Sequence, residues 1–248
     1  MANSTLTLQS RKKVADGTEL FAFDKPADFQ YEAGQYVALV LNKKLLVADM
    51  RGPVRSFSLS SAPFESEIFF TMRQGQSGFK QTIFTYAPGD TIMVTKPIGK
   101  FTLSHASDGK PIVFLVGGIG ITPVRSILKQ AEHEGIDREF ILIYSNRFEK
   151  DAAFHDELSS LKLKNYRYVT TLSQETTPCT KENEERGYIC EEMVRKYVSD
   201  IQGVWYYLVG APAFIETMEA MLEKMEVPKE RQESDPFTGL TRPDDRKK

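Results

Sequence analysis

The sequence predicts two unlike domains: an all-β domain built as a small antiparallel barrel or sandwich, followed by an α/β domain with a doubly wound parallel sheet. Two observations lead to this prediction. The first hundred residues hold short β-rich segments separated by turn dipeptides such as Asp-Gly and Pro-Gly. From residue 111 onward, strand patterns alternate with helical ones, as in sheets whose parallel strands are joined by helices.

The strands of the first half are short and rich in β-branched and aromatic residues. We expect them at residues 6–14, 20–23, 36–40, 57–59, 68–72 and 91–94. Their regular spacing is typical of barrels and sandwiches. Residues 79–86 are compatible with a helix that covers one end of the barrel.

The second half begins with the apolar run PIVFLV at residues 111–116, which suits a buried parallel strand. Further strands are expected at 139–145, 166–172 and 205–210, helices at 124–135, 151–161, 190–198 and 213–225, and a last sheet segment at 235–240. The change of pattern near residues 104–110 separates a domain of residues 1–106 from a domain of residues 107–248.

The composition is that of an ordinary globular protein and excludes several classes of function. The 248 residues are 41% hydrophobic and 27% charged, with a formal net charge of −2. Scattered basic residues argue against nucleic acid or an anionic membrane as partner, and no apolar run could span a bilayer. Cys179 and Cys190 lack the spacing of a zinc site, so we expect no bound metal and a reduced, cytoplasmic protein. The start, MANSTLTLQS, shows no secretory signal.

A glycine-rich turn, VGGIGITP, follows the first strand of the second half. Gly117, Gly118 and Gly120 remove side chains where a backbone approaches a ligand, and the next helix offers its N-terminal amides to a diphosphate. Thr122 could cap that helix, and Pro123 suits its first turn. The turn therefore favours a nucleotide site, with a tight turn in an unliganded α/β domain as the alternative.

Two more strand ends in this half carry candidate binding residues. The strand WYYLVG ends at Gly210, and Ala211 and Pro212 then begin a helix, so this end and the glycine turn could face one crevice. The strand that ends in YSNR presents Ser145 and Arg147 instead of an acid. A hydroxyl beside a guanidinium suits the 2′-phosphate of NADP, although an exposed polar loop explains the same residues.

The stretch RSFSLSS, residues 55–61, is unusual for a strand because four hydroxyls surround one leucine. An exposed edge strand is one explanation. A flavin site is the other, because a flavin needs a cation for its diphosphate, an aromatic wall and a polar partner for ring atom N5. Farther on, QSGFKQT offers Ser77, backbone amides around Gly78, and Lys80 at a helix start, which would make a second anion-binding corner.

In order, RSFSLSSAP, SGFKQT, PIGKF, GGIGITP, YSNR, LVGAP and DPFTGL resemble the motifs of the ferredoxin–NADP reductase superfamily, over residues 6–240. The resemblance implies an FAD-binding Greek-key antiparallel barrel, followed by a domain that binds NADP or NAD. It implies that Arg55 pairs with the FAD diphosphate, that Phe57 flanks the isoalloxazine, and that Ser58, the candidate catalytic residue, hydrogen-bonds near N5.

The full cofactor-binding set implied by the motifs and the resemblance is Arg55, Ser56, Phe57, Ser58, Met72, Ser77, Gly78, Phe79, Lys80, Gly117, Gly118, Gly120, Thr122, Pro123, Ser145, Arg147, Gly210, Ala211, Pro212 and Phe237. Phe237, in DPFTGL, would pack beside the flavin and control nicotinamide access, or else anchor the chain end to the core.

The chain departs from the family pattern at several positions. Phe57 stands where many relatives have tyrosine, which removes a hydroxyl but keeps the stacking surface. Ser77 and Lys80 replace a glycine and a serine, and Lys80 adds charge. Val209 replaces a cysteine near the nicotinamide, so a thiol is missing there, and Leu240 replaces a terminal aromatic.

The expected function is therefore that of a flavoprotein oxidoreductase. It would pass a hydride from NADPH or NADH to bound FAD and then electrons to an acceptor such as ferredoxin, flavodoxin or a small molecule. A free-flavin or ferric reductase, and an electron-transfer subunit of a larger complex, remain as alternatives.

Overall fold

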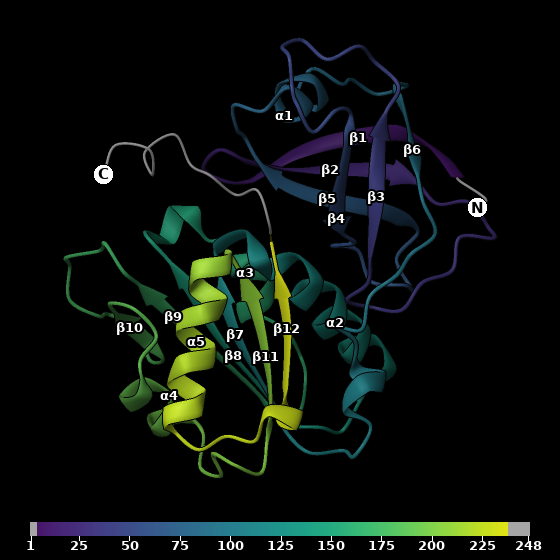
Figure 1. Ribbon diagram of the computed structural model, residues 1–248. Coiled ribbons are helices and arrows are strands. Elements are labelled where there is room, and N and C mark those ends of the chain that lie inside the picture. Colours follow the sequence, from purple (N-terminus) through teal and green to yellow (C-terminus); the bar gives the residue numbers. More distant parts are fainter. Residues whose placement is uncertain (1–3, 238–248) are drawn as a thin grey trace.

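The computed structural model describes residues 4–237, which form two domains that each contain a six-stranded sheet (Figure 1). The strand order is β4-β3-β6-β1-β2-β5 in the first sheet and β10-β9-β8-β7-β11-β12 in the second. The first sheet is antiparallel and the second is parallel. The predicted fold class is confirmed.

The antiparallel sheet curls around its own hydrophobic core. Its strands are β1 (Ser4–Ala15), β2 (Thr18–Asp24), β3 (Tyr36–Leu41), β4 (Val54–Ser58), β5 (Glu67–Arg73) and β6 (Thr91–Val94). Side chains alternate along the strands, and the inward ones, such as Phe21, Phe23 and Phe70, are buried together. Helix α1 (Gly78–Ile83) adds Phe79 and Ile83 to this core.

Two hydroxyls that follow β4 close this barrel. The amide and the hydroxyl of Ser60 both donate to the carbonyl of Phe69 in β5, at 2.9 and 3.0 Å, and Ser61 Oγ accepts from the Phe69 amide at 3.0 Å. The Ser60 hydroxyl also lies 2.9 Å from that of Thr71. The serines at the end of RSFSLSS are therefore buried and hydrogen-bonded, and an exposed edge strand does not describe them.

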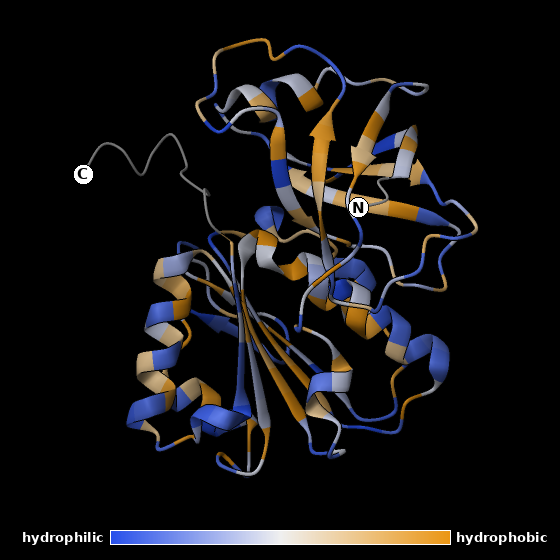
Figure 2. Cartoon of the chain, turned by 45° about the vertical axis from the view of Figure 1, so that its right-hand side comes forward, coloured by the Kyte–Doolittle hydropathy of each residue, from blue (hydrophilic) through white to orange (hydrophobic). Residues whose placement is uncertain are grey.

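The parallel sheet carries helices on both faces. Its strands are β7 (Ile112–Gly117), β8 (Phe140–Asn146), β9 (Tyr166–Leu172), β10 (Glu184–Arg186), β11 (Trp205–Gly210) and β12 (Gln232–Pro236). Its helices are α2 (Ile121–Glu134) and α3 (His155–Ser159) on one face, and α4 (Glu191–Tyr197) and α5 (Pro212–Lys224) on the other. Figure 2 shows hydrophobic residues along the strands and hydrophilic residues on the outer sides of the helices.

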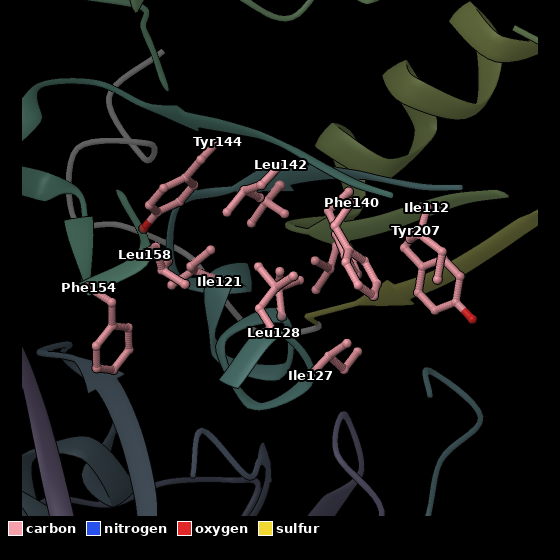
Figure 3. Packing of buried hydrophobic residues seen from close by; sticks show 14 of the residues in the cluster. Ile112, Ile121, Ile127, Leu128, Phe140, Leu142, Tyr144, Phe154, Leu158 and Tyr207 are labelled. Atoms are coloured by element: carbon pink, nitrogen blue, oxygen red, sulfur yellow. The ribbon is translucent and has the colours of Figure 1, made fainter. Parts of the chain in front are cut away.

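The core on the α2 face is the larger of the two in this domain. Figure 3 shows Phe140 and Tyr207 from the sheet beside Ile127 and Leu128 from α2. Short 3₁₀ turns join the elements: η1 (Leu103–Ala106), η2 (Gly118–Gly120), η3 (Glu149–Asp151) and η4 (Lys229–Arg231). This face of the sheet also meets the barrel domain.

Some local expectations were wrong. The helix expected at 151–161 is divided into η3 and α3, because Phe154 takes a left-handed backbone conformation with φ of 62° that no helix can continue through. Strand β10 was not predicted, since its three residues EER carry no apolar signal. Strand β4 begins at Val54 and ends at Ser58, whereas residues 57–59 were expected.

Arg125 of α2 joins the two domains. Its guanidinium is buried and donates to the Ser60 carbonyl and to Glu65 in the barrel domain, and to Glu157 of α3 on its other side. Ser126, the next residue, donates to the Ser61 carbonyl at 2.6 Å. A buried cation with two carboxylates makes this contact specific in geometry.

The chain passes from one sheet to the other between β6 and β7, an interval that contains the expected boundary at residue 106. The division at that residue stays a prediction. In residues 4–237, no helix is both long enough and apolar enough to cross a bilayer.

Candidate cofactor and nucleotide site

A cavity of about 490 Å³ lies where the barrel meets the carboxyl ends of the parallel strands. It is lined by Tyr36, Asp49, Arg51, Arg55, Ser56, Phe57, Ser58, Thr71, Met72, Arg73, Ser77, Phe79, Lys80, Ile119, Thr122, Asp235, Pro236 and Phe237. Most of these residues come from β4, β5, α1 and the loop before β4. The α/β domain contributes its glycine turn and the end of β12.

The cavity brings together many of the residues singled out in the sequence. Those that line it are Arg55, Ser56, Phe57, Ser58, Met72, Ser77, Phe79, Lys80, Thr122 and Phe237. Those that do not line it are Gly78, Gly117, Gly118, Gly120, Pro123, Ser145, Arg147, Gly210, Ala211 and Pro212. The binding role of each residue stays a prediction.

Strand β4 and helix α1 together supply an aromatic wall. The rings of Phe57 and Phe79 stack with centroids 5.6 Å apart, and the Arg55 guanidinium carbon lies 5.6 Å from the Phe79 ring centre. Ser58 is buried beside them, and its hydroxyl makes no hydrogen bond within residues 4–237. A hydroxyl in this state is available to a ligand that enters the cavity.

Asp49 joins the two anion-binding corners that were expected to be separate. Its carboxylate accepts from the Arg55 guanidinium at 2.6 Å and from the amides of Arg51 and Phe79 at 3.0 and 3.2 Å. Burial acts to raise the pKa of Asp49, but these hydrogen bonds outweigh it and hold the pKa below its ordinary value.

Arg55 is therefore already paired with a carboxylate. One of its nitrogens also donates to the carbonyls of Arg51, Gly52 and Val54. The expectation that amides around Gly78 are free for an anion was wrong for Phe79, whose amide is bound to Asp49, and for Lys80, whose amide donates to Ser77 Oγ.

Three cations of the cavity wall lack an acidic partner among the described residues: Lys80 and Arg73 are half-buried, and Arg51 is exposed. Burial and, to a smaller extent, repulsion from Arg73 together lower the pKa of Lys80 to about 8. Arg73 donates to the Asp151 carbonyl at 3.3 Å, across the domain boundary. Two half-buried cations without a carboxylate near them suit an anionic group.

The glycines of the expected nucleotide turn have specific neighbours. A side chain at Gly117 or at Gly210 would meet the ring of Phe214, and one at Gly120 would meet the backbone of Val209. Gly118 has a φ of 54° and lies beside the Arg73 guanidinium. Close packing of strands and helix explains why position 120 is a glycine. Gly118 instead faces the side of the cavity where Arg73 lies.

The beginning of α2 differs from the prediction. The helix starts at Ile121 after η2, so Gly120 is the cap residue and no side chain caps the helix. The hydroxyl of Thr122 instead donates to the Ile119 carbonyl at 3.3 Å. Pro123 falls in the first turn, as expected, because this position needs no amide donor.

Ser145 and Arg147 lie at the carboxyl edge of the parallel sheet, outside the cavity. Ser145 aligns with Gly117 on one side and with Thr171 on the other. The Arg147 carbonyl accepts from the Gln174 amide at 3.0 Å. The two residues thus lie on the same edge as the glycine turn, as a site for an extended dinucleotide requires.

The end of β12 reaches the cavity with Asp235 and Phe237. The Phe237 amide donates to the Gly210 carbonyl at 2.8 Å, and its ring packs on the core of the α2 face while lining the cavity. Burial raises the pKa of Asp235 to about 6, with a contribution from Glu233. Residues 238–240 of DPFTGL lie outside the described residues, and a shielding role for Phe237 stays a prediction.

Sequence reasoning missed several lining residues: Tyr36, Asp49, Arg51, Thr71, Arg73, Ile119, Asp235 and Pro236. Tyr36 could have been found, because it aligns with Ser58 across the β3–β4 pair. Asp49 and Arg51 lie in a loop without periodicity and gave no such signal. Residues 4–237 contain no group of three or more His, Cys, Asp or Glu side chains arranged to hold a metal ion.

Comparison with known proteins identifies reductases that are similar to this chain. Residues 114–220 match the family described as the oxidoreductase NAD-binding domain. The chain is 34% identical over 151 residues to ferredoxin–NADP reductase B of Sorangium cellulosum, covering 59% of each chain. These matches agree with the resemblance of the chain to the ferredoxin–NADP reductase superfamily.

Other reductases resemble the chain over most of its length. It is 28% identical to the reductase component of propane 2-monooxygenase from Mycolicibacterium goodii, over 86% of this chain and 61% of that protein. A ferredoxin NADP⁺ reductase of Neisseria gonorrhoeae, solved with bound FAD and NADP, superposes with a TM-score of 0.78 at 21% identity, over 94% of this chain and 98% of the other. The chain spans 52–61% of the length of several curated relatives.

Proposed function

We propose that this protein is an NAD(P)H-dependent flavoprotein oxidoreductase that passes electrons from NADPH or NADH, through bound FAD, to a separate acceptor. The observation that carries the proposal is the cavity between the domains. It combines an aromatic wall, a free hydroxyl and unpaired cations with the carboxyl edge of a parallel sheet. Nucleotides bind at such edges in open α/β sheets.

The side chains of the cavity are of the types that would bind the groups of FAD. Phe57, backed by the buried ring of Phe79, presents an apolar ring for a planar ring system, and Ser58 presents an unused hydroxyl. Burial lowers the pKa of Lys80, which has no carboxylate partner. A diphosphate bound beside Lys80 would stabilise its charged form. Bound FAD would supply hydride acceptance and the release of electrons one at a time.

The chain's own residues would bind the flavin, orient its ring and shield it from water. Ser58 would hold a hydrogen bond to the flavin ring, and Phe57 would fix the plane of that ring. Phe237 and Ile119 would exclude water on the side of the α/β domain, where the glycine turn admits the nicotinamide nucleotide. Fixed orientation of two reactants is a large part of the catalytic effect in such a reaction.

The Asp49 contact favours a second candidate, a free-flavin reductase. Asp49 already satisfies Arg55 and the Phe79 amide, which leaves fewer donors for a diphosphate. In that case flavin would be a substrate and would leave after reduction. The partial coverage of relatives named as reductase components also suits a subunit of a larger complex.

Purification and turnover separate these candidates. We expect a yellow protein that releases FAD on denaturation and that reduces ferricyanide with NADPH or NADH. A colourless protein that oxidises NADPH only when FAD or FMN is added in excess would favour the free-flavin reductase. A yellow protein without turnover until a partner is added would favour the subunit.

A further inference from the structure

Arg125 of α2 receives one carboxylate and one aromatic ring from each domain. Its side chain is 5% exposed. Glu65 of the barrel domain accepts from Nη1 and Nη2 at 2.9 and 3.0 Å, and Glu157 of α3 accepts from Nε and Nη2 at 3.0 and 2.7 Å. The guanidinium carbon also lies 5.4 Å from the ring centre of Phe69 and 5.1 Å from that of Phe154. Because both carboxylates bind through two bonds, the domains cannot shift past each other here without breaking one of these contacts.

The ring of Phe154 reaches Arg125 from a backbone conformation that is unfavourable for a bulky residue. Phe154 has a φ of 62°, in the left-handed region. Residues held in this region cluster at functional sites, where the surrounding contacts maintain them. Helix α3 begins directly after Phe154 and carries Glu157 to the guanidinium. The strained residue therefore belongs to the contact that joins the domains.

On the barrel side, α2 is bonded to the chain directly after the cavity strand β4. Arg125 Nη1 donates to the Ser60 carbonyl at 2.6 Å, and the Ser126 hydroxyl donates to the Ser61 carbonyl at 2.6 Å. Ser58, two residues before Ser60, lines the cavity. The Ser60 hydroxyl is also bonded to β5, the neighbouring strand of the cavity wall. A displacement of α2 would thus reach both strands.

On the side of the α/β domain, the same helix begins at the glycine turn. Helix α2 starts at Ile121, directly after Gly118–Gly120, and Thr122 in its first turn lines the cavity. Arg125 follows Thr122 by three residues, a spacing that places both on one side of a helix. One helix of 14 residues therefore connects the glycine turn to the end of β4.

We propose that Arg125, together with Ser126, is a positioning residue for hydride transfer. It fixes the glycine turn, where the nicotinamide would lie, relative to the end of β4, where the flavin ring would lie. The proposal rests on the proposed function. In that reaction a hydride, two electrons with one proton, leaves C4 of the nicotinamide of NADPH and is taken up by N5 of FAD, so that NADP⁺ is formed. A misplacement of about 1 Å between two reactants can cost on the order of a hundredfold in rate.

The test compares Arg125→Lys with the parent in the anaerobic stopped-flow reduction of the FAD-bound protein by NADPH. A lysine keeps the positive charge but lacks the planar fork that binds Ser60 and both carboxylates at once. We expect the rate at saturating NADPH to fall about tenfold or more, while the dissociation constant for NADPH changes less than about twofold. Ser126→Ala removes only the contact with Ser61, and we expect it to slow the reaction about threefold.

Two control variants separate positioning from a general loss of stability. Lys129→Met removes an ion pair with Glu132 from the next turn of α2, within the α/β domain. Leu222→Ala removes a buried side chain of α5 on the opposite face of the sheet and so lowers stability away from the barrel domain. At a temperature at which all variants are folded, both controls should be reduced at the parent's rate.

A second measurement needs neither flavin nor turnover. Nitroxide labels at two exposed positions, on Lys12→Cys in β1 and Glu192→Cys in α4, report the distance between the domains when Cys179 and Cys190 are replaced by serine. The distribution of distances should be broader in Arg125→Lys than in the parent, and it should be unchanged in the two control variants.

The positioning role is overturned if Arg125→Lys is reduced at the parent's rate, if only its dissociation constant for NADPH changes, or if Leu222→Ala is slowed equally. A distance distribution that is the same in Arg125→Lys and in the parent also overturns it. A parent protein whose flavin is reduced by neither NADPH nor NADH would contradict the proposed function, and the distance distribution would then decide by itself whether Arg125 fixes the domains.

Discussion

Lys80 is the residue whose charge depends most on what the cavity holds. Its side chain is half-buried without a carboxylate partner, and partial burial together with repulsion from Arg73 lowers its pKa to about 8. An anion in the cavity stabilises the charged form, and binding therefore favours protonated Lys80. The affinity for an anionic ligand should fall as the pH rises through this pKa.

We predict that Lys80→Met weakens FAD binding by roughly 1.5–3 kcal/mol, tenfold to a hundredfold, through loss of a charge-assisted contact. In the parent, the FAD dissociation constant should rise between about pH 8 and pH 10, and in Lys80→Met it should not. Lys80→Arg stays charged over this range, so it should keep the parent's affinity for FAD at low pH and show no change of affinity as the pH rises. Fluorescence titration of the flavin-free protein measures all three, and an unchanged pH dependence in Lys80→Met would remove Lys80 from the site.

Arg147 carries the prediction of nucleotide preference. A guanidinium at the edge that holds Ser145 would contact the 2′-phosphate of NADPH, which NADH lacks. Arg147→Ala should raise the KM for NADPH about tenfold or more and change that for NADH little. Arg195→Ala, on the outer side of α4, serves as the control. Equal changes with both nucleotides in steady-state kinetics would contradict the assignment.

At the residue scale, sequence patterns identified Arg55, Phe57, Ser58 and Lys80 as lining residues, because hydroxyl and cation patterns beside glycines are unusual in strands and helix starts. They could not identify Asp49, because its contacts exist only once the loop has folded over α1. For the same reason, the pairing that neutralises Arg55 could not be read from the sequence.

At the scale of elements, α2 connects the two halves of the site. Its first turn follows the glycine turn. One turn later, Arg125 binds the carbonyl of Ser60, which lies two residues after the end of the cavity strand β4. Arg125 is thus one of the contacts, together with those of Ser126 and Arg73, that hold the glycine turn in place relative to β4. A helix pattern predicts α2 well, but this contact is between residues 65 positions apart, which periodicity does not encode.

We predict that Arg125→Met destabilises the protein by about 3 kcal/mol, because Glu65 and Glu157 lose their shared partner while remaining partly buried. Arg195→Met, which removes a half-exposed pair with Glu191, should cost only about 0.3–0.5 kcal/mol. Urea unfolding followed by tryptophan fluorescence compares them. If both substitutions cost the same small amount, Arg125 does not join the domains energetically.

Element boundaries were less predictable than element types. The α/β half was predicted almost strand by strand, since continuous apolar runs and helical periodicity are strong signals. The division of residues 151–161 escaped prediction, because a left-handed phenylalanine at 154 has no sequence signature. Strand β10 is short and polar, and it forms only by pairing with β9.

For the whole molecule, the two domains form one cavity that neither contains alone. The barrel domain gives the aromatic wall and all of the lining cations, and the α/β domain gives the glycine turn and the end of β12. The order of motifs along the chain predicted both domains. The relative placement of the domains depends on side-chain contacts such as that between Arg73 and the Asp151 carbonyl, which only the folded structure shows.

An anaerobic absorption titration of the purified protein decides whether it is an NAD(P)H-dependent flavoprotein. We expect a flavin spectrum before addition, bleached in proportion to added NADPH at one equivalent per protein-bound FAD, and restored by ferricyanide. A purified protein that binds no FAD at micromolar concentration, or whose bound flavin stays oxidised with both NADPH and NADH, would contradict it.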